Sequence, residues 1–226
     1  MAFVNIFDTD FRLPSKVCIL APGPNGKTHY ADIPDDYTVL AVNKAVLIDA
    51  VEADVWLMNL ADQAWFEAAN AVFEGVRVFW REEPDSPHYN PVIEQRLQAT
   101  DHTPCYYFHA VRPGLRRLRT GHSIAQLIGL HILSGGTVTG AALQLACHFG
   151  AREVLLCGVD LSGDDYWDGS VGEQPGNGET WRSIDVLNAL IRWMTLAQGI
   201  AVATLSPTKL DVPPYHAVKV FAEQTR

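Results

Sequence analysis

Polar residues follow several short apolar runs of this sequence, and their positions suggest where chemistry takes place. Asn43, Asn59 and Asp160 each come at or just after the end of such a run. These runs are typical of parallel strands, whose carboxyl ends meet at one edge of a sheet, where ligands bind. Residues 21–26, Ala-Pro-Gly-Pro-Asn-Gly, form an expected loop directly after the first run, so residues 21–25 lie at its end in the same way, and residues 139–140 open an expected helix. We therefore expect these positions to form one polar rim.

The residue types of this rim favour a neutral or anionic ligand. Asparagine amides both donate and accept hydrogen bonds, and the free N–H groups at a helix start attract anions. We expect no strong cation and no nucleophile in the rim. The sequence contains no GxGxxG fingerprint and no Walker loop, which disfavours an NAD dehydrogenase and a P-loop NTPase. It also lacks HExxH and GxSxG, which weakens zinc-hydrolase and α/β-hydrolase interpretations.

Asp160 has two interpretations that the sequence leaves open. It ends the run Val154-Leu-Leu-Cys-Gly-Val-Asp, so we expect its carboxylate where the sheet edge meets a long loop. There it either binds a ligand hydroxyl or a metal, or caps the following turn through its own backbone. Gly158 leaves room for a ligand or a backbone segment to come close.

Short β-branched runs alternate with helical patterns along the chain. The expected strands are residues 17–20, 39–42, 55–58, 76–80, 154–157 and 200–205. Helices are expected over residues 61–73, 139–149 and 183–198, where apolar residues recur at helical spacing. The alternation predicts an α/β fold with a Rossmann-like, mostly parallel sheet and helices on both faces. No linker or repeat divides the chain, so we expect a single domain over residues 1–226.

Composition and charge exclude several classes of function. The chain has 226 residues, of which 48% are hydrophobic and 19% charged, as in ordinary globular proteins. Its formal net charge of −9 argues against nucleic acid as a partner. No apolar run approaches the roughly 20 residues of a transmembrane helix, and the first residues do not resemble a secretory signal. We expect a cytoplasmic protein, and the sequence leaves its oligomeric state open, a homo-oligomer included.

Two further segments are candidates for ligand contacts. Residues 161–180 form a long stretch rich in Gly and Asp, and a loop of that length is usually functional or disordered. We expect it to be mobile without ligand, with Tyr166 and Trp167 either closing over a bound sugar or packing on the surface. Residues 112–119 hold four arginines, which form a solvated basic turn or a clamp for an acidic or phosphorylated substrate.

Two stretches of the chain resemble known families. Val17-Cys-Ile-Leu-Ala-Pro-Gly-Pro-Asn and Pro34-Asp-Asp-Tyr-Thr-Val-Leu-Ala-Val-Asn-Lys are similar to the opening of bacterial lipooligosaccharide sialyltransferases of glycosyltransferase family 42. They are also similar to the related domain of unknown function 115 group, which includes the archaeal 6-hydroxymethylpterin diphosphokinases. Residues 137–160, with Thr139-Gly140 and the Gly158-Val-Asp160 ending, resemble the second half of these families. The resemblance covers residues 16–60 and 136–206.

The resemblance implies a Rossmann-type sheet on which CMP, from a CMP-sugar donor, lies across the strand ends. It implies that Asn43 and Asn59 hold the nucleotide, that Thr139 and Gly140 start the helix beside it, and that Asp160 belongs to the strand-end motif. Together with the strand-end positions, it predicts a nucleotide-binding set of Ala21, Pro22, Gly23, Pro24, Asn25, Asn43, Asn59, Thr139, Gly140, Gly158, Asp160 and Ser162.

Several positions depart from the sialyltransferase pattern. Ser162 stands where that family has a tyrosine after the strand-end aspartate, and Tyr166 replaces a second tyrosine only loosely. The stretch 178–185, before the last long helix, contains no counterpart of the family's general-base histidine. Our candidate catalytic residues are therefore the carboxylates Glu179 and Asp165, together with Tyr166. A carboxylate acts as a base near neutral pH only if burial raises its pKa.

These observations lead to one leading hypothesis and two alternatives. The first is a glycosyltransferase-like protein that takes a nucleotide-sugar donor, CMP-linked, and a glycan acceptor that is a surface-glycan precursor. The second is pterin diphosphokinase-like phosphoryl transfer from ATP, which needs Mg²⁺ on carboxylates such as Asp160, Asp164 and Asp165. The third is a catalytically silent module that binds a nucleotide or glycan. Outside the second alternative we expect no metal and no cofactor.

Overall fold

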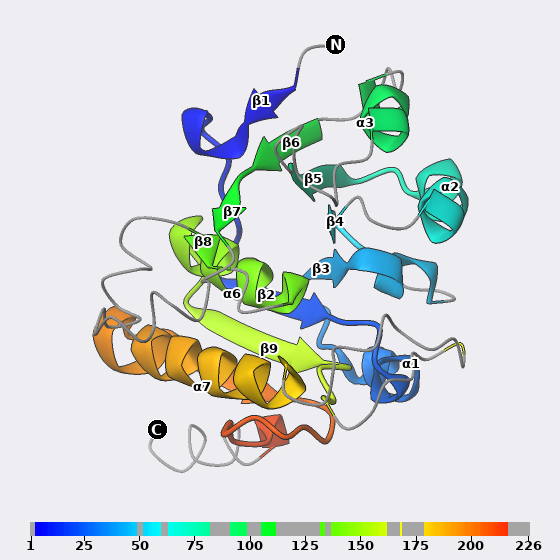
Figure 1. Ribbon diagram of the computed structural model, residues 1–226. Helices are drawn as coiled ribbons and strands as arrows, with labels where there is room; N and C mark the ends of the chain where they lie inside the picture. The colour runs from blue at the N-terminus through cyan, green and yellow to red at the C-terminus, as the bar shows by residue number, and fades with distance from the viewer. Residues whose placement is uncertain are drawn as a thin grey trace.

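Eight parallel strands form the central sheet of the computed structural model (Figure 1). The strand order is β1-β6-β5-β4-β3-β2-β9-β10, and every neighbouring pair is parallel. A separate two-stranded sheet pairs β7 (Ala110–Val111) with β8 (Ile132–Leu133). The structure describes residues 3–48, 52–59, 63–81, 91–98, 105–111, 132–133, 137–161, 168 and 179–216.

All six predicted strands are present in the sheet. They are β2 (Lys16–Leu20), β3 (Thr38–Val42), β4 (Val55–Asn59), β5 (Val76–Trp80), β9 (Glu153–Cys157) and β10 (Ala201–Thr204). Two further strands, β1 (Val4–Asn5) and β6 (Cys105–Phe108), were not predicted. Both lie at one end of the sheet, where short strands with partly exposed side chains suffice and the apolar signal is correspondingly weak.

The described helices are α1 (Pro24–His29), α2 (Gln63–Val72), α3 (Pro91–Gln98), α6 (Val138–His148) and α7 (Glu179–Gln198). Of these, α2, α6 and α7 were predicted, although α7 starts earlier than the expected residue 183. The interpretation of residues 21–26 as a loop is wrong from Pro24 onward. Pro24 is the first residue of α1, where its fixed φ suits a helix and its missing N–H is not needed.

Helices cover both faces of the sheet, as predicted. On one face α6 and α7 pack against the strands, with Leu187 of α7 in the same apolar cluster as Ile19 of β2. On the other face α2 packs against β4, and the rings of Phe66 and Trp56 stack with centroids 5.8 Å apart. The predicted α/β fold, a parallel Rossmann-like sheet between helices, is thereby confirmed.

The chain reverses its direction across the sheet between β2 and β9. From β2 it proceeds through β3, β4, β5 and β6, whereas β9 and β10 are added on the opposite side of β2. Leu20 pairs with Ala41 and Cys157, and Ala41 pairs with Trp56, so β9 and β2 end at one level, while β3 continues one residue and β4 three residues further toward the same edge. Open parallel sheets bind ligands at the carboxyl edge beside such a reversal. We therefore expect a ligand at this edge.

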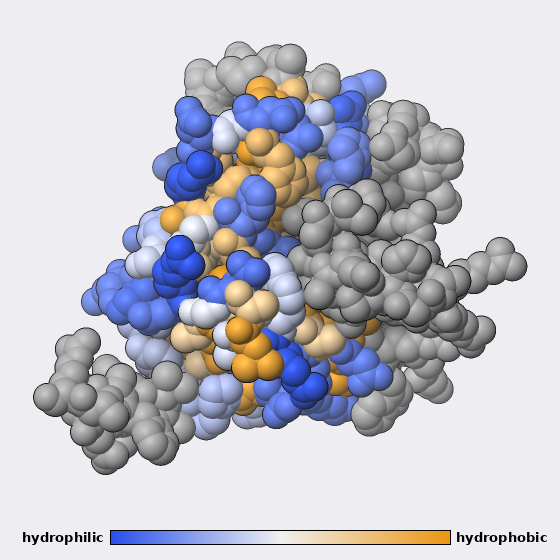
Figure 2. Space-filling model, turned by 90° about the vertical axis from the view of Figure 1, so that its left-hand side faces the viewer, coloured by the Kyte–Doolittle hydropathy of each residue, from blue (hydrophilic) through white to orange (hydrophobic). Residues whose placement is uncertain are grey.

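On the side of the molecule that lies at the left of Figure 1, the described residues form hydrophilic areas with hydrophobic areas between them (Figure 2). Within the described part of the chain, none of the helices is both long and apolar enough to cross a membrane.

Candidate functional site

The segments that follow β2 and β9 bind directly to each other. The Gly23 N–H donates to the Gly158 carbonyl oxygen at 3.0 Å. The Asn25 N–H, in the first turn of α1, donates to Asp160 Oδ2 at 2.8 Å. A carboxylate of the protein itself therefore lies at the start of this short helix, where it stabilises the exposed N–H groups. Of the remaining predicted loop residues, Ala21 and Pro22 are buried and Pro24 is exposed.

Glycines make this contact possible. A Cβ atom on Gly23 would lie 2.3 Å from the Gly158 carbonyl oxygen, and one on Gly26 would lie 2.6 Å from the Ala21 carbonyl oxygen. Gly158 has a φ of +71°, and a Cβ there would lie 2.4 Å from the same Ala21 oxygen. At Gly158 the sequence allowed close approach of a ligand or of a backbone segment, and the structure contains the backbone segment.

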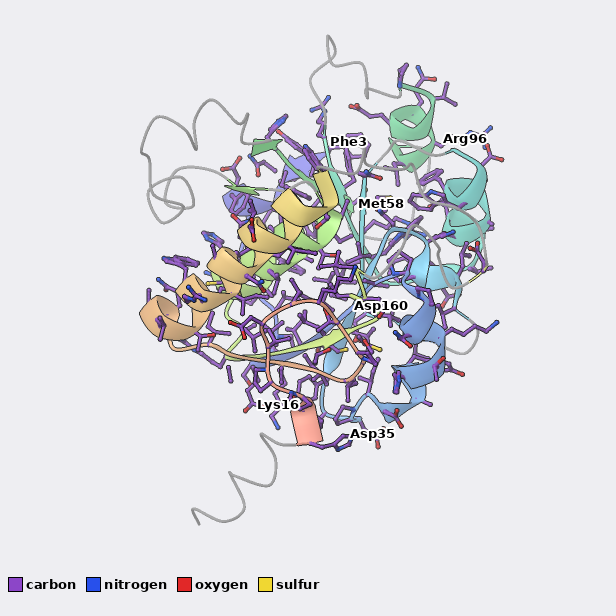
Figure 3. All side chains as sticks on the ribbon, turned by 60° about the horizontal axis from the view of Figure 1, so that its bottom comes forward. Phe3, Lys16, Asp35, Met58, Arg96 and Asp160 are labelled. Carbon is purple, nitrogen blue, oxygen red and sulfur yellow. The ribbon has the colours of Figure 1, made fainter. Side chains whose placement is uncertain are left out.

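Asp160 is almost completely buried at the carboxyl edge, beside α1 (Figure 3). Its Oδ1 atom has no hydrogen-bond partner among the described residues. Burial raises the pKa of Asp160, and the backbone and side chain of Asn25, the charge of His29 and the Ser206 hydroxyl act against that rise. Asp160 thus caps the start of α1, and the turn that follows it lies outside the described residues from position 162 onward. Its role toward a ligand stays a prediction.

Paired asparagines close the ends of β3 and β4. Asn43 Oδ1 accepts a hydrogen bond from the Asn59 N–H at 3.0 Å, and the Trp56 indole N–H donates to the Asn43 carbonyl oxygen at 2.8 Å. Asn43 has a φ of +50°, in the left-handed region that Asn tolerates better than most residues. Both asparagine side chains are half-buried. The two N–H donors of the Asn43 amide suit a base or phosphate oxygen.

Lys44 is a residue of this edge that the sequence analysis missed. It follows Asn43 in the 3-10 helix η3 (Asn43–Leu47), and its side chain is only 8% exposed. Its Nζ lies 2.8 Å from Oδ1 of Asp168, in the segment that follows β9. The expectation of a rim without a strong cation is therefore wrong. A lysine inside an apolar-looking stretch was the available signal, because a buried ammonium needs an anionic partner.

The start of α6 points toward the same edge. The C-terminal end of α6 leads directly into the amino end of β9, so α6 runs antiparallel to the strands beneath it. The Thr137 hydroxyl caps the helix by accepting the Gly140 N–H at 3.2 Å, and the Gln144 side-chain amide donates to the Gly140 carbonyl at 2.9 Å. Thr139 and Gly140 are both buried in the first turn. The cap is thus Thr137, two residues before the predicted helix start.

The sheet brings most of the predicted set to one edge. Because neighbouring strands are about 4.8 Å apart, the four strands β9, β2, β3 and β4 are together about 14 Å wide at this edge. Three predicted residues, Ser162, Asp165 and Tyr166, lie outside the described residues, as do Asp164, Trp167 and residues 112–119. Glu179 is the first residue of α7, and its side chain also lies outside the described part.

A groove of about 500 Å³ runs along β10 between α7 and residues 211–215, with mainly apolar walls. None of the predicted site residues lines it, so it is separate from the carboxyl edge. No three His, Cys, Asp or Glu side chains in the described ranges are grouped closely enough to hold a metal ion.

Comparisons with known proteins give similarity to solved structures alone. No family model matches the chain, and no curated protein matches it. The sialyltransferase CstII from Campylobacter jejuni, in complex with the substrate analogue CMP-3FNeuAc, is similar with a TM-score of 0.48 and 15% identity over 88% of this chain and 85% of that chain. The sialyltransferase CST-II with a trisaccharide acceptor and CMP has the same TM-score and 14% identity, over 88% and 86%. We take no residue role from similarity at this level.

Proposed function

We propose that this protein binds a nucleotide-sugar, with CMP as its nucleotide, at the carboxyl edge of the sheet and transfers the sugar to a glycan acceptor. One observation carries the proposal. The paired Asn43 and Asn59 and the buried cation Lys44 lie together beside the chain reversal between β2 and β9. That position is where open parallel sheets bind ligands, and amide and ammonium donors suit a nucleotide. The resemblance of the strand-end motifs to glycosyltransferase family 42 supports cytidine as the base.

The start of α6 fits the same ligand. Its first turn holds Thr139 and Gly140, and the N-terminus of an eleven-residue helix carries partial positive charge that favours a phosphate. In contrast, the start of α1 already meets the Asp160 carboxylate. The phosphate of the proposed nucleotide is therefore expected at α6 rather than at α1, which refines the prediction for residues 21–25.

The proposed reaction is a direct displacement at the anomeric carbon of the donor. An acceptor hydroxyl loses its proton to a carboxylate, its oxygen forms a bond to the anomeric carbon, and the bond from that carbon to the phosphate oxygen breaks. CMP leaves with the electron pair of the broken bond. The N–H donors and the Lys44 ammonium stabilise the charge that develops on the departing phosphate. Glu179 and Asp165 remain the candidates for the base.

Isothermal titration of the whole chain with CMP tests the binding step. We expect CMP to bind, and Asn43→Asp to weaken binding about tenfold or more, because the substitution keeps the acceptor for Asn59 but replaces two donors by negative charge. Asn188→Asp is the matched control. Asn188 also accepts a backbone N–H, that of Asp211 at 2.8 Å, but it lies on α7 beside the separate groove.

The outcomes separate the three hypotheses. Release of CMP from a CMP-sugar in the presence of an acceptor supports transfer, whereas binding without turnover supports the silent module. A melting shift with ATP and Mg²⁺, but none with CMP, would replace the proposal with phosphoryl transfer. Equal CMP affinity in Asn43→Asp and Asn188→Asp would remove the asparagine pair from the binding site.

A further inference from the structure

The ion pair between Lys44 and Asp168 lies at this edge and joins two segments that are far apart in the sequence. Lys44 follows β3 and Asp168 belongs to the segment after β9, and in the sheet these two strands are separated by β2. The pair therefore joins the two sides of the chain reversal. Most other contacts at this edge involve backbone groups, but this one is made by two side chains.

The two partners of this pair differ in their exposure to solvent. The Lys44 side chain is 8% exposed and that of Asp168 is 37% exposed. Because a buried ammonium is costly without an anion, Lys44 requires a negatively charged partner whether or not a ligand is present. Asp168 retains contact with water, so breaking the ion pair costs Asp168 less free energy than it costs Lys44. Lys44 is thus the fixed member of the pair, and its anion is the exchangeable one.

The charge of the whole chain makes a local cation necessary for an anionic ligand. Acidic residues outnumber basic ones by 26 to 17, which gives the net charge of −9. The net field of the protein therefore repels a nucleotide phosphate. At the carboxyl edge the Asp160 carboxylate adds to this repulsion whenever it is ionised. Lys44 is the buried cation that compensates for it at this edge.

We infer that Lys44 binds the phosphate of the nucleotide and that Asp168 occupies the same ammonium when no ligand is bound. The inference rests on the proposed function and assigns a residue to it. Both anions present oxygen atoms that accept charge-assisted hydrogen bonds from an ammonium. A carboxylate and a phosphate on one ammonium repel each other, so we expect the ligand phosphate to displace Asp168, which makes the aspartate a built-in competitor.

The test compares ligands that differ only in the phosphate. We measure the affinities of CMP, cytidine and inorganic pyrophosphate for the wild type, Lys44→Gln, Lys44→Arg and Asp168→Asn by isothermal titration. Lys44→Gln is expected to weaken the affinity for CMP about tenfold or more and to leave the affinity for cytidine unchanged, because only CMP carries the phosphate charge. Asp168→Asn is expected to raise the affinity for CMP about threefold, because it weakens the ion pair with Lys44 that competes with the phosphate. Lys44→Arg should keep most of the affinity.

A matched control comes from the other end of β2. Lys16 pairs with Asp36 at 2.7 Å, but both side chains lie at the surface, and Lys16 marks the amino end of the strand (Figure 3). Lys16→Gln removes the same charge from the protein without touching the carboxyl edge, and it should leave the affinity for CMP within about twofold after correction for ionic strength.

Each outcome of this test decides something. Equal losses of CMP and cytidine binding in Lys44→Gln would show a structural role and overturn the inference. Weaker CMP binding in Asp168→Asn would make Asp168 a ligand contact or a support, which also overturns it. If the wild type binds no CMP, the proposed function fails. The inference then stands only if pyrophosphate binds the wild type and Lys44→Gln abolishes that binding. N-acetylneuraminic acid is tested on the same variants. If its affinity changes in them and that of CMP does not, the anion bound by Lys44 is a sugar carboxylate rather than the nucleotide phosphate.

Discussion

The two halves of the carboxyl edge are built in opposite ways. At the end of β2 and β9 the protein is in contact with itself, because Gly23 and Gly158 let two backbone segments meet and Asp160 caps α1. At the end of β3 and β4 each contact involves a side chain, because Asn43 Oδ1 accepts the Asn59 N–H and Lys44 pairs with Asp168 in a distant segment. The first half is a structural joint. The second half, with its side-chain contacts, is where we propose that the ligand binds.

Breaking the joint should have the largest effect on the protein. Gly158→Ala places a Cβ 2.4 Å from the Ala21 carbonyl oxygen and 2.7 Å from Gly26 Cα, at a φ of +71°. Both neighbours are backbone atoms that cannot turn away, so we expect a loss of about 3 kcal/mol or more in the free energy of unfolding. Urea denaturation followed by circular dichroism measures it.

The control for this substitution is Gly199→Ala. Gly199 has a similar φ of +65°, but a Cβ there meets nothing within 4 Å. It therefore carries only the cost of the left-handed backbone, about 1 kcal/mol. Equal losses in the two variants would mean that crowding at the joint contributes nothing, and that the glycine serves backbone conformation alone.

Weakening the second half should cost less stability. Asn43→Ala removes the acceptor of the Asn59 N–H and leaves a residue with no polar side chain at a φ of +50°. We expect a loss of about 1–2 kcal/mol in the free energy of unfolding. Asn43→Gly separates the two causes, because it restores the backbone freedom but not the hydrogen bond. If Asn43→Gly is as stable as the wild type, the hydrogen bond from the Asn59 N–H contributes nothing to the free energy of unfolding.

The smallest expected effect is that of Asp160→Asn, and it depends on pH. Burial raises the pKa of Asp160 in the folded state, so its favourable contribution is complete below the unfolded value of about 3.9 and is lost as the pH rises through the folded pKa. Asparagine keeps an acceptor for the Asn25 N–H but does not titrate. The free energy of unfolding of the wild type, minus that of the variant, should therefore fall as the pH rises above the unfolded pKa of Asp160, about 3.9.

We expect that difference to stay within about 1 kcal/mol at any pH. Melting curves of both proteins at closely spaced pH values measure it. A difference that grows with pH would mean that the ionised carboxylate is stabilised in the folded protein, contrary to the raised pKa. Titration with CMP on the same two proteins asks separately whether Asp160 contributes to a ligand site. A tenfold weaker affinity in Asp160→Asn, at unchanged stability, would assign it such a role.

The sequence by itself determined six of the eight strands of the sheet, the fold class and the edge at which polar residues gather. The runs that become β2, β3, β4, β5 and β9 are apolar at nearly every position because both faces of the sheet are covered, and this signal is local. Residues directly after such runs lie at the carboxyl edge by geometry alone. That is why Asn43, Asn59 and Asp160 were found without a structure.

Only the tertiary structure decided which partners these residues have. Asp160 and Asn25 are far apart in the sequence, as are Lys44 and Asp168, and nothing in their local patterns indicates that they meet. The order of the strands places β9 beside β2, and this brings a carboxylate to the start of α1 and the segment after β9 toward Lys44. A contact between distant segments depends on strand order, and a single sequence encodes that order only through the energy of the whole fold.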